Sequence, residues 1–445
     1  MNSLTHQNTQ HKQAEVMNPT PCHNKEHRCN LLKKGKFPSI SNHTASFLFY
    51  TASLATLFSF YLIFHPKIFT QTTDIQVYSQ EIPSTKLPKD ISETCDLFKG
   101  KWVPDASDSS YTNYSCGTIP FARNCFMHGR RDSEFLRWRW KPHQCELPRF
   151  EAANFLRVVR GKTMAFIGDS VARNQMESLL CLLSTAETPK AKHKDPDDRF
   201  PTWEFQKHNF TLMSLWSQFL VFASERVVNG STTGGFDLHL DKIDTNWSEK
   251  LPEIEYAVFS DAHWFFRQNY LYENGKLIGC VYCQTPNVTD LGPGLAIRRA
   301  FRTTFKKVNS CKTCRQTFSL LRTYSPSHFE NAAWNKGGVC NKTRPAGKEE
   351  IDMARADFDY RKIQVDEVEI AREAGEAHGN VFEILDVTEM MVMRPDGHPG
   401  VHWGNQWMKG YSDCIHWCLP GPIDTWNQLM LEIIKKWNHN FDVDR

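Results

Sequence analysis

An apolar run leads directly into a serine turn at Thr163-Met-Ala-Phe-Ile-Gly-Asp-Ser170. The first five residues have the continuous apolar character of a buried β-strand, and a helical pattern follows the serine as far as Leu183. A turn between such a strand and helix places Ser170 at the amino end of the helix. Free backbone N–H groups and the helix dipole there favour a developing negative charge. The stretch therefore predicts an α/β fold with a candidate nucleophile at the end of a strand.

A second acid and a histidine occur far downstream, at Asp413-Cys-Ile-His416. A serine hydroxyl is a weak nucleophile at neutral pH, so an imidazole must take its proton and a carboxylate must orient that imidazole. Asp413 and His416 are three residues apart and can meet across one turn. Together with Ser170 they predict a serine acyl-transfer enzyme. The alternative is a β-turn serine and a structural histidine beside two cysteines.

Candidate strands alternate with helical patterns from Gly161 onward. Those with the apolar character of buried parallel strands are Thr163–Ile167, Tyr256–Ser260, Thr317–Thr323 and Val381–Asp386. The longest helical pattern runs from Lys348 to about His378 with many charged residues, typical of a solvated helix face, and a last helix is expected over Ile423–Asn438. This alternation predicts an α/β domain with a mainly parallel sheet, whose sites form at the carboxyl ends of strands.

The composition limits the classes of partner. The formal net charge is only +3 over 445 residues, which argues against nucleic acid or an acidic polymer as a partner. The hydrophobic share of 40% suffices for one large domain or two smaller ones. The 13 Trp and 12 Tyr suit stacking against neutral sugar rings, but they suit a core equally well.

The long uncharged stretch Thr44–Phe64 is close to the length needed to cross a bilayer. Three lysines precede it, at Lys33, Lys34 and Lys36, and only Lys67 follows closely. The positive-inside bias therefore predicts a type II membrane protein with its N-terminus in the cytosol. A cleaved signal peptide fits less well, because some 43 polar residues precede the apolar run.

The remaining features of the chain suit a lumen. Six Asn-x-Ser/Thr sequons follow the span, at Asn113, Asn209, Asn229, Asn246, Asn287 and Asn341. Twelve of the 14 cysteines also follow it, while Cys22 and Cys29 are expected to be free thiols. We expect a cytosolic disordered tail (1–43), a signal anchor (44–64), a luminal stem (65–93), a Cys-rich subdomain (94–150) and a catalytic domain (151–445).

Blocks of sequence along residues 94–440 resemble the plant trichome birefringence-like family, polysaccharide O-acetyltransferases with a PC-esterase domain. The blocks are Cys95-Asp-Leu-Phe-Lys-Gly-Lys-Trp-Val103, Leu136-Arg-Trp-Arg-Trp-Lys-Pro142, Leu147-Pro-Arg-Phe150, Phe166-Ile-Gly-Asp-Ser-Val-Ala-Arg-Asn-Gln175, Arg322-Thr-Tyr-Ser-Pro326 and Asp413-Cys-Ile-His-Trp-Cys-Leu-Pro-Gly421. The resemblance implies an SGNH-hydrolase-like α/β fold with a major and a minor lobe, Golgi residence, and acetyl transfer to wall polysaccharides. The four cysteines and many aromatic residues between Cys95 and Cys145 predict a disulfide-stapled N-terminal subdomain.

The resemblance also assigns residues to the site. The family triad falls on Ser170 as nucleophile, His416 as general base and Asp413 as its orienting acid. Further candidates for substrate or oxyanion contacts are Gly168, Asp169, Arg173, Asn174, Ser260, His263 and Trp264. For Arg173 and Asn174 the alternative is helix capping and a surface ion pair. Many relatives carry Asn where this chain has Ser260, which puts an oxyanion role of that residue in doubt.

The cysteines allow two interpretations. Cys280-x-x-Cys283 and Cys311-x-x-Cys314 could form a zinc ribbon in a cytosolic protein, whereas an oxidising lumen favours disulfides between or within the pairs. The resemblance implies four further bridges, Cys95–Cys145, Cys116–Cys181, Cys125–Cys418 and Cys340–Cys414. We expect no metal and no tightly bound cofactor, although an acetyl donor of unknown identity is required.

Four subgroup blocks resemble the xyloglucan O-acetyltransferase branch of the family. They are Ala262-His-Trp-Phe-Phe-Arg267, Gly279-Cys-Val-Tyr-Cys283, Arg394-Pro-Asp-Gly-His-Pro399 and Pro420-Gly-Pro-Ile-Asp-Thr-Trp426. Xyloglucan is therefore the expected acceptor and partner. The open alternatives are an O-acetyltransferase of xylan or mannan, a polysaccharide acetyl esterase, and a non-catalytic glycan-binding wall protein.

Overall fold

The computed structural model describes residues 95–445, except for residues 315, 376–379, 405–409 and 444–445. The expected tail, membrane span and stem at residues 1–43, 44–64 and 65–93 lie outside the described residues. In the part of the chain that the structure describes, no helix is long and apolar enough to cross a membrane.

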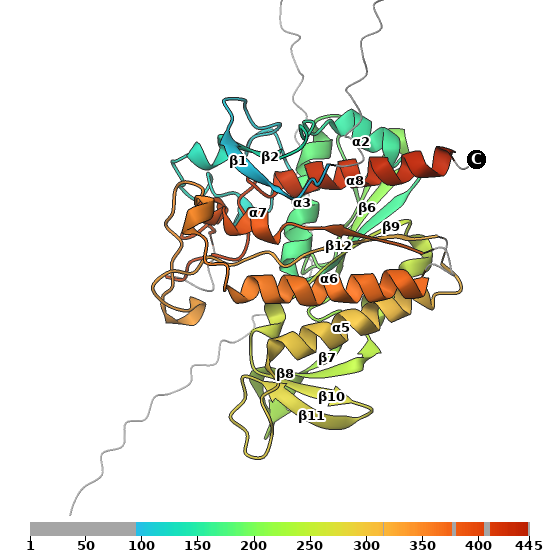
Figure 1. Ribbon diagram of the computed structural model, residues 1–445, viewed down its shortest axis with the longest axis vertical. Helices are drawn as coiled ribbons and strands as arrows, with labels where there is room; N and C mark the ends of the chain where they lie inside the picture. Colours follow the sequence, from blue (N-terminus) through green and yellow to red (C-terminus); the bar gives the residue numbers. More distant parts are fainter. Residues whose placement is uncertain (1–94, 315, 376–379, 405–409, 444–445) are drawn as a thin grey trace, which may run out of the picture. The chain divides into compact units, whose positions relative to one another are not determined.

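A seven-stranded sheet forms the centre of the fold, in the order β13-β12-β9-β3-β6-β5-β4 (Figure 1). Five neighbouring strands are parallel: β3 (Thr163–Gly168), β6 (Phe210–Trp216), β9 (Tyr256–Ser260), β12 (Phe318–Arg322) and β13 (Val381–Leu385). Two antiparallel strands, β4 (Lys190–His193) and β5 (Thr202–Phe205), complete one edge. The predicted α/β fold is confirmed, and all four predicted strands belong to the parallel part.

Helices cover both faces of this sheet because successive side chains of its strands point to opposite sides. On β3, Met164 and Phe166 pack in one core with α2, α3 and α8, whereas Ala165 and Ile167 pack in a second core with α5 and α6. The helices are α2 (Ala152–Val158), α3 (Ser170–Ser184), α5 (Gly292–Asn309), α6 (Ala356–Gly375) and α8 (Asp424–Val443), with short helices α4 (Thr245–Ser248) and α7 (Thr388–Val392). The central strands are therefore buried on both faces.

The long helix expected from Lys348 to about His378 is shorter in the structure. Lys348–Glu350 form a separate 3₁₀ turn, and α6 begins only at Ala356. Between them Ile351 has extended backbone and packs against the core, which interrupts the helical path. The other single 3₁₀ turns are Phe121–Arg123, Glu134–Leu136, Gln206–His208, Leu251–Glu253, His263–Phe265, Trp334–Lys336 and Pro395–Gly397.

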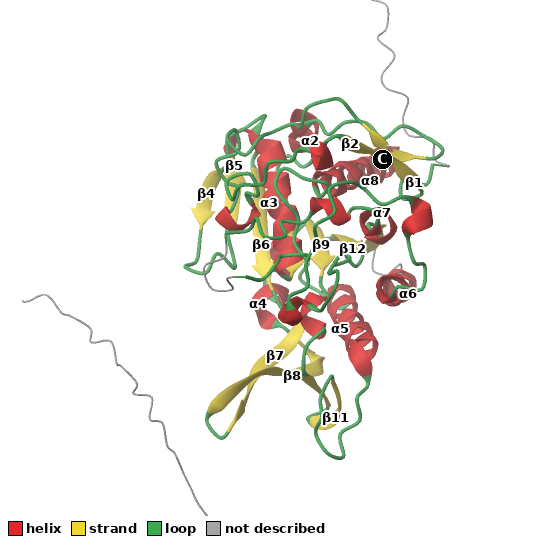
Figure 2. Cartoon of the chain, turned by 90° about the vertical axis from the view of Figure 1, so that its left-hand side faces the viewer, coloured by secondary structure: helices red, strands yellow, loops and turns green. Residues whose placement is uncertain are grey.

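A second, four-stranded sheet projects from the helical layer beside α5 (Figure 2). Its order is β11-β10-β8-β7, with the bounds β7 (Val221–Val228), β8 (Ser231–Ile243), β10 (Asn269–Glu273) and β11 (Lys276–Val281). β8 and β10 are parallel and the other pairs antiparallel. None of its strands was among those predicted from the sequence. With this sheet, the fold holds mixed sheets rather than one mainly parallel sheet.

The N-terminal subdomain packs on the large sheet's helical layer and shares its core. Strands β1 (Gly100–Pro104) and β2 (Trp138–Pro142) form an antiparallel pair whose Trp102 and Trp140 are buried in the core of α2, α3 and α8. The indole N–H of Trp102 donates to the carbonyl of Met390 at 2.8 Å. This subdomain therefore does not form the projecting sheet, whose strands lie in residues 221–243 and 269–281 instead.

Six disulfides fasten the described chain. The pairs are Cys95–Cys145, Cys116–Cys181, Cys125–Cys418, Cys280–Cys283, Cys311–Cys314 and Cys340–Cys414. The four long-range pairs are those that the family resemblance implies. Each Cys-x-x-Cys motif closes on itself.

Candidate active site

Ser170 lies at the carboxyl end of β3 and is the first residue of α3. The turn requires glycine at position 168, because its φ is +142° and a Cβ would collide with the carbonyl oxygen of Ser260. Asp169 caps the helix, since its Oδ1 accepts from the backbone N–H of Val171 at 2.9 Å and of Ala172 at 3.4 Å. The strand and helix thus hold the hydroxyl at a fixed, partly exposed position.

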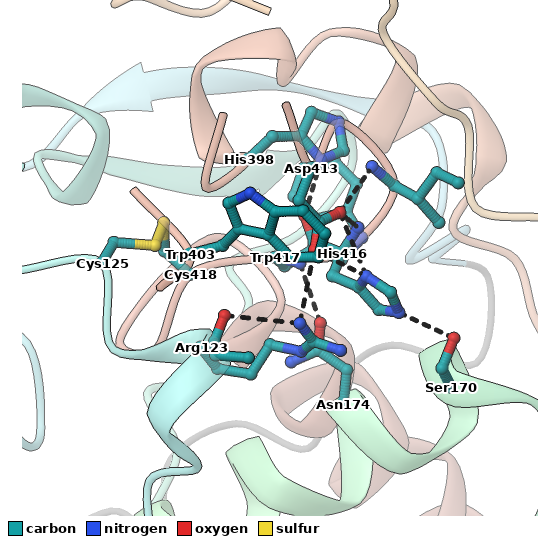
Figure 3. Close-up of polar contacts among 12 residues, drawn as sticks. Arg123, Cys125, Ser170, Asn174, His398, Trp403, Asp413, His416, Trp417 and Cys418 are labelled. Atoms are coloured by element: carbon teal, nitrogen blue, oxygen red, sulfur yellow. Dashed lines mark hydrogen bonds and ion pairs between the residues drawn. A yellow bond between two sulfur atoms is a disulfide. The ribbon is translucent and has the colours of Figure 1, made fainter. Parts of the chain in front are cut away.

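A hydrogen-bonded chain connects Ser170, His416 and Asp413 (Figure 3). Nε2 of His416 lies 2.7 Å from Oγ of Ser170, and its Nδ1 lies 2.8 Å from Oδ2 of Asp413. The carboxylate can only accept at neutral pH, so the proton of the imidazole resides on Nδ1 and Nε2 is left to accept from the serine. The geometry is that required for general-base activation of a hydroxyl.

Backbone N–H groups fix the carboxylate of Asp413. Its Oδ1 accepts from the N–H of Ile415 at 3.2 Å and of His416 at 3.0 Å. Burial alone would raise the pKa of Asp413, but the charge and hydrogen bonds of His416 and the charge of Arg123 outweigh it and hold that pKa far below its ordinary value. Asp413 therefore stays ionised throughout the physiological range.

The pKa of His416 is lowered from its ordinary value of 6.5. Burial has the largest effect, the charge of Arg123 adds to it, and the attraction of Asp413 opposes both. A lowered pKa leaves the imidazole neutral at pH 7, which is the state that can accept the proton of Ser170.

Five contacts hold the segment that carries Asp413 and His416. Oδ1 of Asn174 on α3 accepts from the N–H of Trp417 at 2.8 Å. Nδ1 of His398 lies 2.7 Å from the carbonyl of His416, and its ring stacks on Trp417 with centroids 4.1 Å apart. The remaining two are the disulfides of Cys414 and Cys418 with Cys340 and Cys125. Asn174, a residue singled out in the sequence, thus aligns the backbone next to the histidine.

The contacts of Arg173 are with residues outside this chain of hydrogen bonds. Its Nη1 donates to the carbonyl of Asp198 at 2.8 Å, its guanidinium lies 5.3 Å from the ring centre of Trp216, and its Nε is 3.6 Å from Glu177. Trp216 in turn contacts Trp264 edge-on, with ring centres 6.2 Å apart. Arg173, Trp216 and Trp264 therefore form one cluster of a cation and two aromatic rings beside α3.

The remaining candidates, His263 and Ser260, lie next to the serine turn. Oδ2 of Asp169 accepts from the N–H of His263 at 3.3 Å, and burial lowers the pKa of His263 to about 4, so its ring is neutral at pH 7. Ser260 is fully buried, and its hydroxyl accepts a hydrogen bond from Nη2 of Arg322. Ser260 is thus part of a buried polar cluster with Arg322 at the end of β9.

Three residues near the site were not among the candidates from sequence. Arg123 contacts Asp413, Arg322 contacts Ser260, and His398 contacts the backbone of His416. Arg322 and His398 lay within quoted motifs, the blocks that begin at Arg322 and at Arg394, whereas Arg123 lay in none. Among the described residues, the structure contains no cluster of three or more His, Cys, Asp or Glu side chains arranged to hold a metal ion.

A central parallel sheet, a serine at the end of its middle strand and an Asp-x-x-His segment beside that serine define an SGNH-like α/β protein. The chain belongs to the PC-esterase family, and to its trichome birefringence-like branch. Residues 147–433 match the model of the "GDSL/SGNH-like Acyl-Esterase family found in Pmr5 and Cas1p". Residues 93–146 match the PMR5 N-terminal domain.

Curated plant proteins are similar over most of the chain. Xyloglucan O-acetyltransferase 3 of Populus trichocarpa is 53% identical over 388 residues, which cover 87% of this chain and 97% of that protein. Xyloglucan O-acetyltransferase 2 of Arabidopsis thaliana is 50% identical over 348 residues, 78% of this chain and 84% of that protein. Protein trichome birefringence-like 20 of Arabidopsis thaliana is 42% identical over 345 residues, 77% of this chain and 72% of that protein.

Proposed function

We propose that the protein is an O-acetyltransferase that transfers acetyl groups to xyloglucan through an acetyl-Ser170 intermediate. The observation that carries the chemistry is the 2.7 Å contact between Oγ of Ser170 and Nε2 of a histidine oriented by Asp413. Family membership and the relatives named xyloglucan O-acetyltransferases support a polysaccharide acceptor, with xyloglucan as the specific choice.

The first half-reaction loads the serine. Oγ of Ser170 attacks the acetyl carbonyl of the donor while Nε2 of His416 takes the hydroxyl proton. The oxyanion forms near the amino end of α3, where the helix dipole favours negative charge. The donor's leaving group departs with the proton from His416, and the acetyl group remains on the serine as an ester.

The second half-reaction transfers the acetyl group from Ser170 to the acceptor. A sugar hydroxyl loses its proton to Nε2 of His416 and attacks the acetyl-serine carbonyl. The serine oxygen leaves, takes the proton back from His416, and the acetylated glycan is released. Throughout, Asp413 holds the imidazole and stabilises its transient positive charge.

The proposal includes a place for this reaction. We propose a Golgi enzyme anchored by Thr44–Phe64 as a type II membrane protein, with the catalytic part in the lumen. The six disulfides suit an oxidising compartment. Five of the sequon asparagines are exposed and accessible to a glycan, namely Asn209, Asn229, Asn246, Asn287 and Asn341.

A polysaccharide acetyl esterase is the second candidate, favoured by the family's description as acyl-esterases. It would use the same Ser170, His416 and Asp413, with water in place of the sugar hydroxyl. The two activities differ in how well the acceptor excludes water from the acetyl-serine.

An acceptor panel tests the function. The full chain and its Ser170→Ala variant are incubated with para-nitrophenyl acetate and de-acetylated oligosaccharides of xyloglucan, xylan, glucomannan and pectin, and added acetyl groups are measured by mass spectrometry. The proposal predicts acetylated xyloglucan with the wild type and none with the variant. Acetylation of another glycan would contradict the acceptor, release of acetate without glycan acetylation would favour the esterase, and transfer unchanged by the substitution would contradict the triad.

A further inference from the structure

Arg123 of the N-terminal subdomain reaches the carboxylate of Asp413 across 290 residues of sequence. Its Nη1 lies 3.3 Å from Oδ2 of Asp413. Figure 3 draws the two side chains and their contact. Both side chains are buried, with 9% of the Arg123 side chain and 4% of the Asp413 side chain exposed. A buried cation and a buried carboxylate at this distance are strongly coupled, because little water screens them.

The hydrogen bonds of Asp413 give this contact a specific task. Oδ1 accepts from the backbone N–H groups of Ile415 and His416. Oδ2 accepts from Nδ1 of His416 at 2.8 Å and from Arg123. The arginine therefore donates to the oxygen that makes the closer contact with the catalytic imidazole. Without it, that buried oxygen would keep His416 as its partner but lose its second donor.

The chain fastens Arg123 at this point. Its carbonyl accepts from the N–H of Leu419 at 2.9 Å, and two residues later Cys125 is disulfide-bonded to Cys418. Nη1 of Arg130 lies 3.4 Å from Sγ of Cys418. The N-terminal subdomain is thus attached to the segment that immediately follows His416, so the backbone of Arg123 is held beside that segment independently of the contact between its guanidinium and Asp413.

Other charged groups surround both residues. Arg123 also lies near Glu177 and Arg173 of α3. His416 is influenced by Asp169 from the serine turn, and His263 and His398 lie close enough to interact with it. Both of these histidines have pKa values lowered to about 4 by burial and are neutral at pH 7. The charges that act on His416 are therefore those of Arg123, Asp413 and Asp169.

We propose that Arg123 is a positioning residue that holds the carboxylate of Asp413 against His416 and places a positive charge beside the imidazole, so that the N-terminal subdomain completes the active site. The inference rests on the proposed role of His416 as the base for Ser170. It assigns a part in the chemistry to residues 93–146, the segment that matches a family model of its own.

The test measures how fast Ser170 is labelled by a reagent, so it needs neither acetyl donor nor glycan. Diisopropyl fluorophosphate reacts with an activated serine: the Oγ–P bond forms, the P–F bond breaks, fluoride leaves and the hydroxyl proton passes to His416. The rate of this reaction is measured against pH in the full chain for the wild type and for Arg123→Gln, Arg123→Met and Arg123→Lys. Arg302→Gln is the matched control, because Arg302 binds the buried Glu367 at 2.7 Å and joins α5 to α6 in the other core. Thermal melting monitors folding of each variant.

The neutral variants are expected to react at least tenfold more slowly at neutral pH, with the acid limb of the profile moved up by about one pH unit. Arg123→Lys is expected to keep the wild-type limb while reacting more slowly, because it retains the cation but loses the planar donor.

The inference is overturned if the neutral variants keep the wild-type limb, if Arg302→Gln moves it equally, or if the lysine variant moves it. If neither neutral variant folds, the position of the acid limb in Arg123→Lys decides whether the inference holds. A wild type that labels at Ser170 but acetylates no glycan refutes the proposed function and leaves this inference standing.

Discussion

Nε2 of His416 lies 2.7 Å from Oγ of Ser170, although 246 residues separate them in the sequence. Two independent parts of the fold produce the contact. The turn after β3 fixes the serine. Asn174 holds the histidine segment against α3, and two disulfides attach that segment to Cys125 and Cys340. The geometry is thus a product of the covalent and hydrogen-bonded frame rather than of one local motif.

Replacement of the carboxylate tests its role in orienting the histidine. Asp413→Asn can donate to Nδ1 of His416 and would favour the tautomer that cannot accept from Ser170. We expect kcat to fall by about 10³- to 10⁴-fold with little change in KM. Steady-state kinetics of acetyl-ester turnover measure this, and a loss of less than tenfold would contradict the assignment.

The loss of activity at low pH reports the pKa of His416. Because burial and Arg123 lower the pKa of this histidine below 6.5, the imidazole remains neutral and competent below that pH. Activity should therefore persist below pH 6.5 and disappear only as the pH falls through the lowered pKa. The measurement is kcat/KM against pH with an acetyl ester whose own hydrolysis is subtracted. A limb at or above pH 6.5 would be inconsistent with the electrostatics of the site.

Asn174 offers a test of backbone alignment. Asn174→Ala removes the acceptor for the N–H of Trp417, so His416 is held less firmly, and we expect activity to fall about ten- to a hundredfold. Asn427→Ala is the matched control, since Asn427 is equally buried on α8 and donates to Gln175 and Ser178. Equal losses of activity in both variants, at equal losses of melting temperature, would show that Asn174 acts only on stability.

The disulfide beside Asp413 should matter for both stability and activity. Cys340–Cys414 closes a sequence separation of 74 residues and includes the neighbour of the orienting acid. Serine at both positions is expected to cost about 2–5 kcal/mol of unfolding free energy and to lower activity. Serine at both Cys311 and Cys314, three residues apart, is the control and should cost far less. Chemical denaturation and turnover of both double variants check this, and a larger loss in the control would contradict it.

The central strands could be predicted because each is a continuous apolar run buried on both faces. The predicted Tyr256–Ser260 coincides with β9, and Thr163–Ile167 differs from β3 by one residue. The projecting sheet was missed for the opposite reason. β7 has mostly exposed or half-exposed side chains and β8 only a few buried ones, so neither shows the apolar run that marked the other strands.

The site divides in the same way. Ser170, Asp413 and His416 lie in short motifs with recognisable spacing, so the sequence alone predicts them. Arg123 lies in a short 3₁₀ turn without a motif, and its contact with Asp413 depends on how the N-terminal subdomain docks. A long-range contact of this kind leaves no periodic or local trace in one sequence.

Trapping the acyl-enzyme tests the central claim most directly. The full chain is mixed with para-nitrophenyl acetate, quenched in acid and digested, and acetylated peptides are located by mass spectrometry before and after a chase with de-acetylated xyloglucan oligosaccharide. We predict an acetyl group on Ser170 that is absent in Ser170→Ala and His416→Gln and that the chase moves onto the oligosaccharide. Acetyl transfer to xyloglucan without any acetyl on Ser170, or an acetyl-Ser170 that xyloglucan does not discharge, would contradict the account.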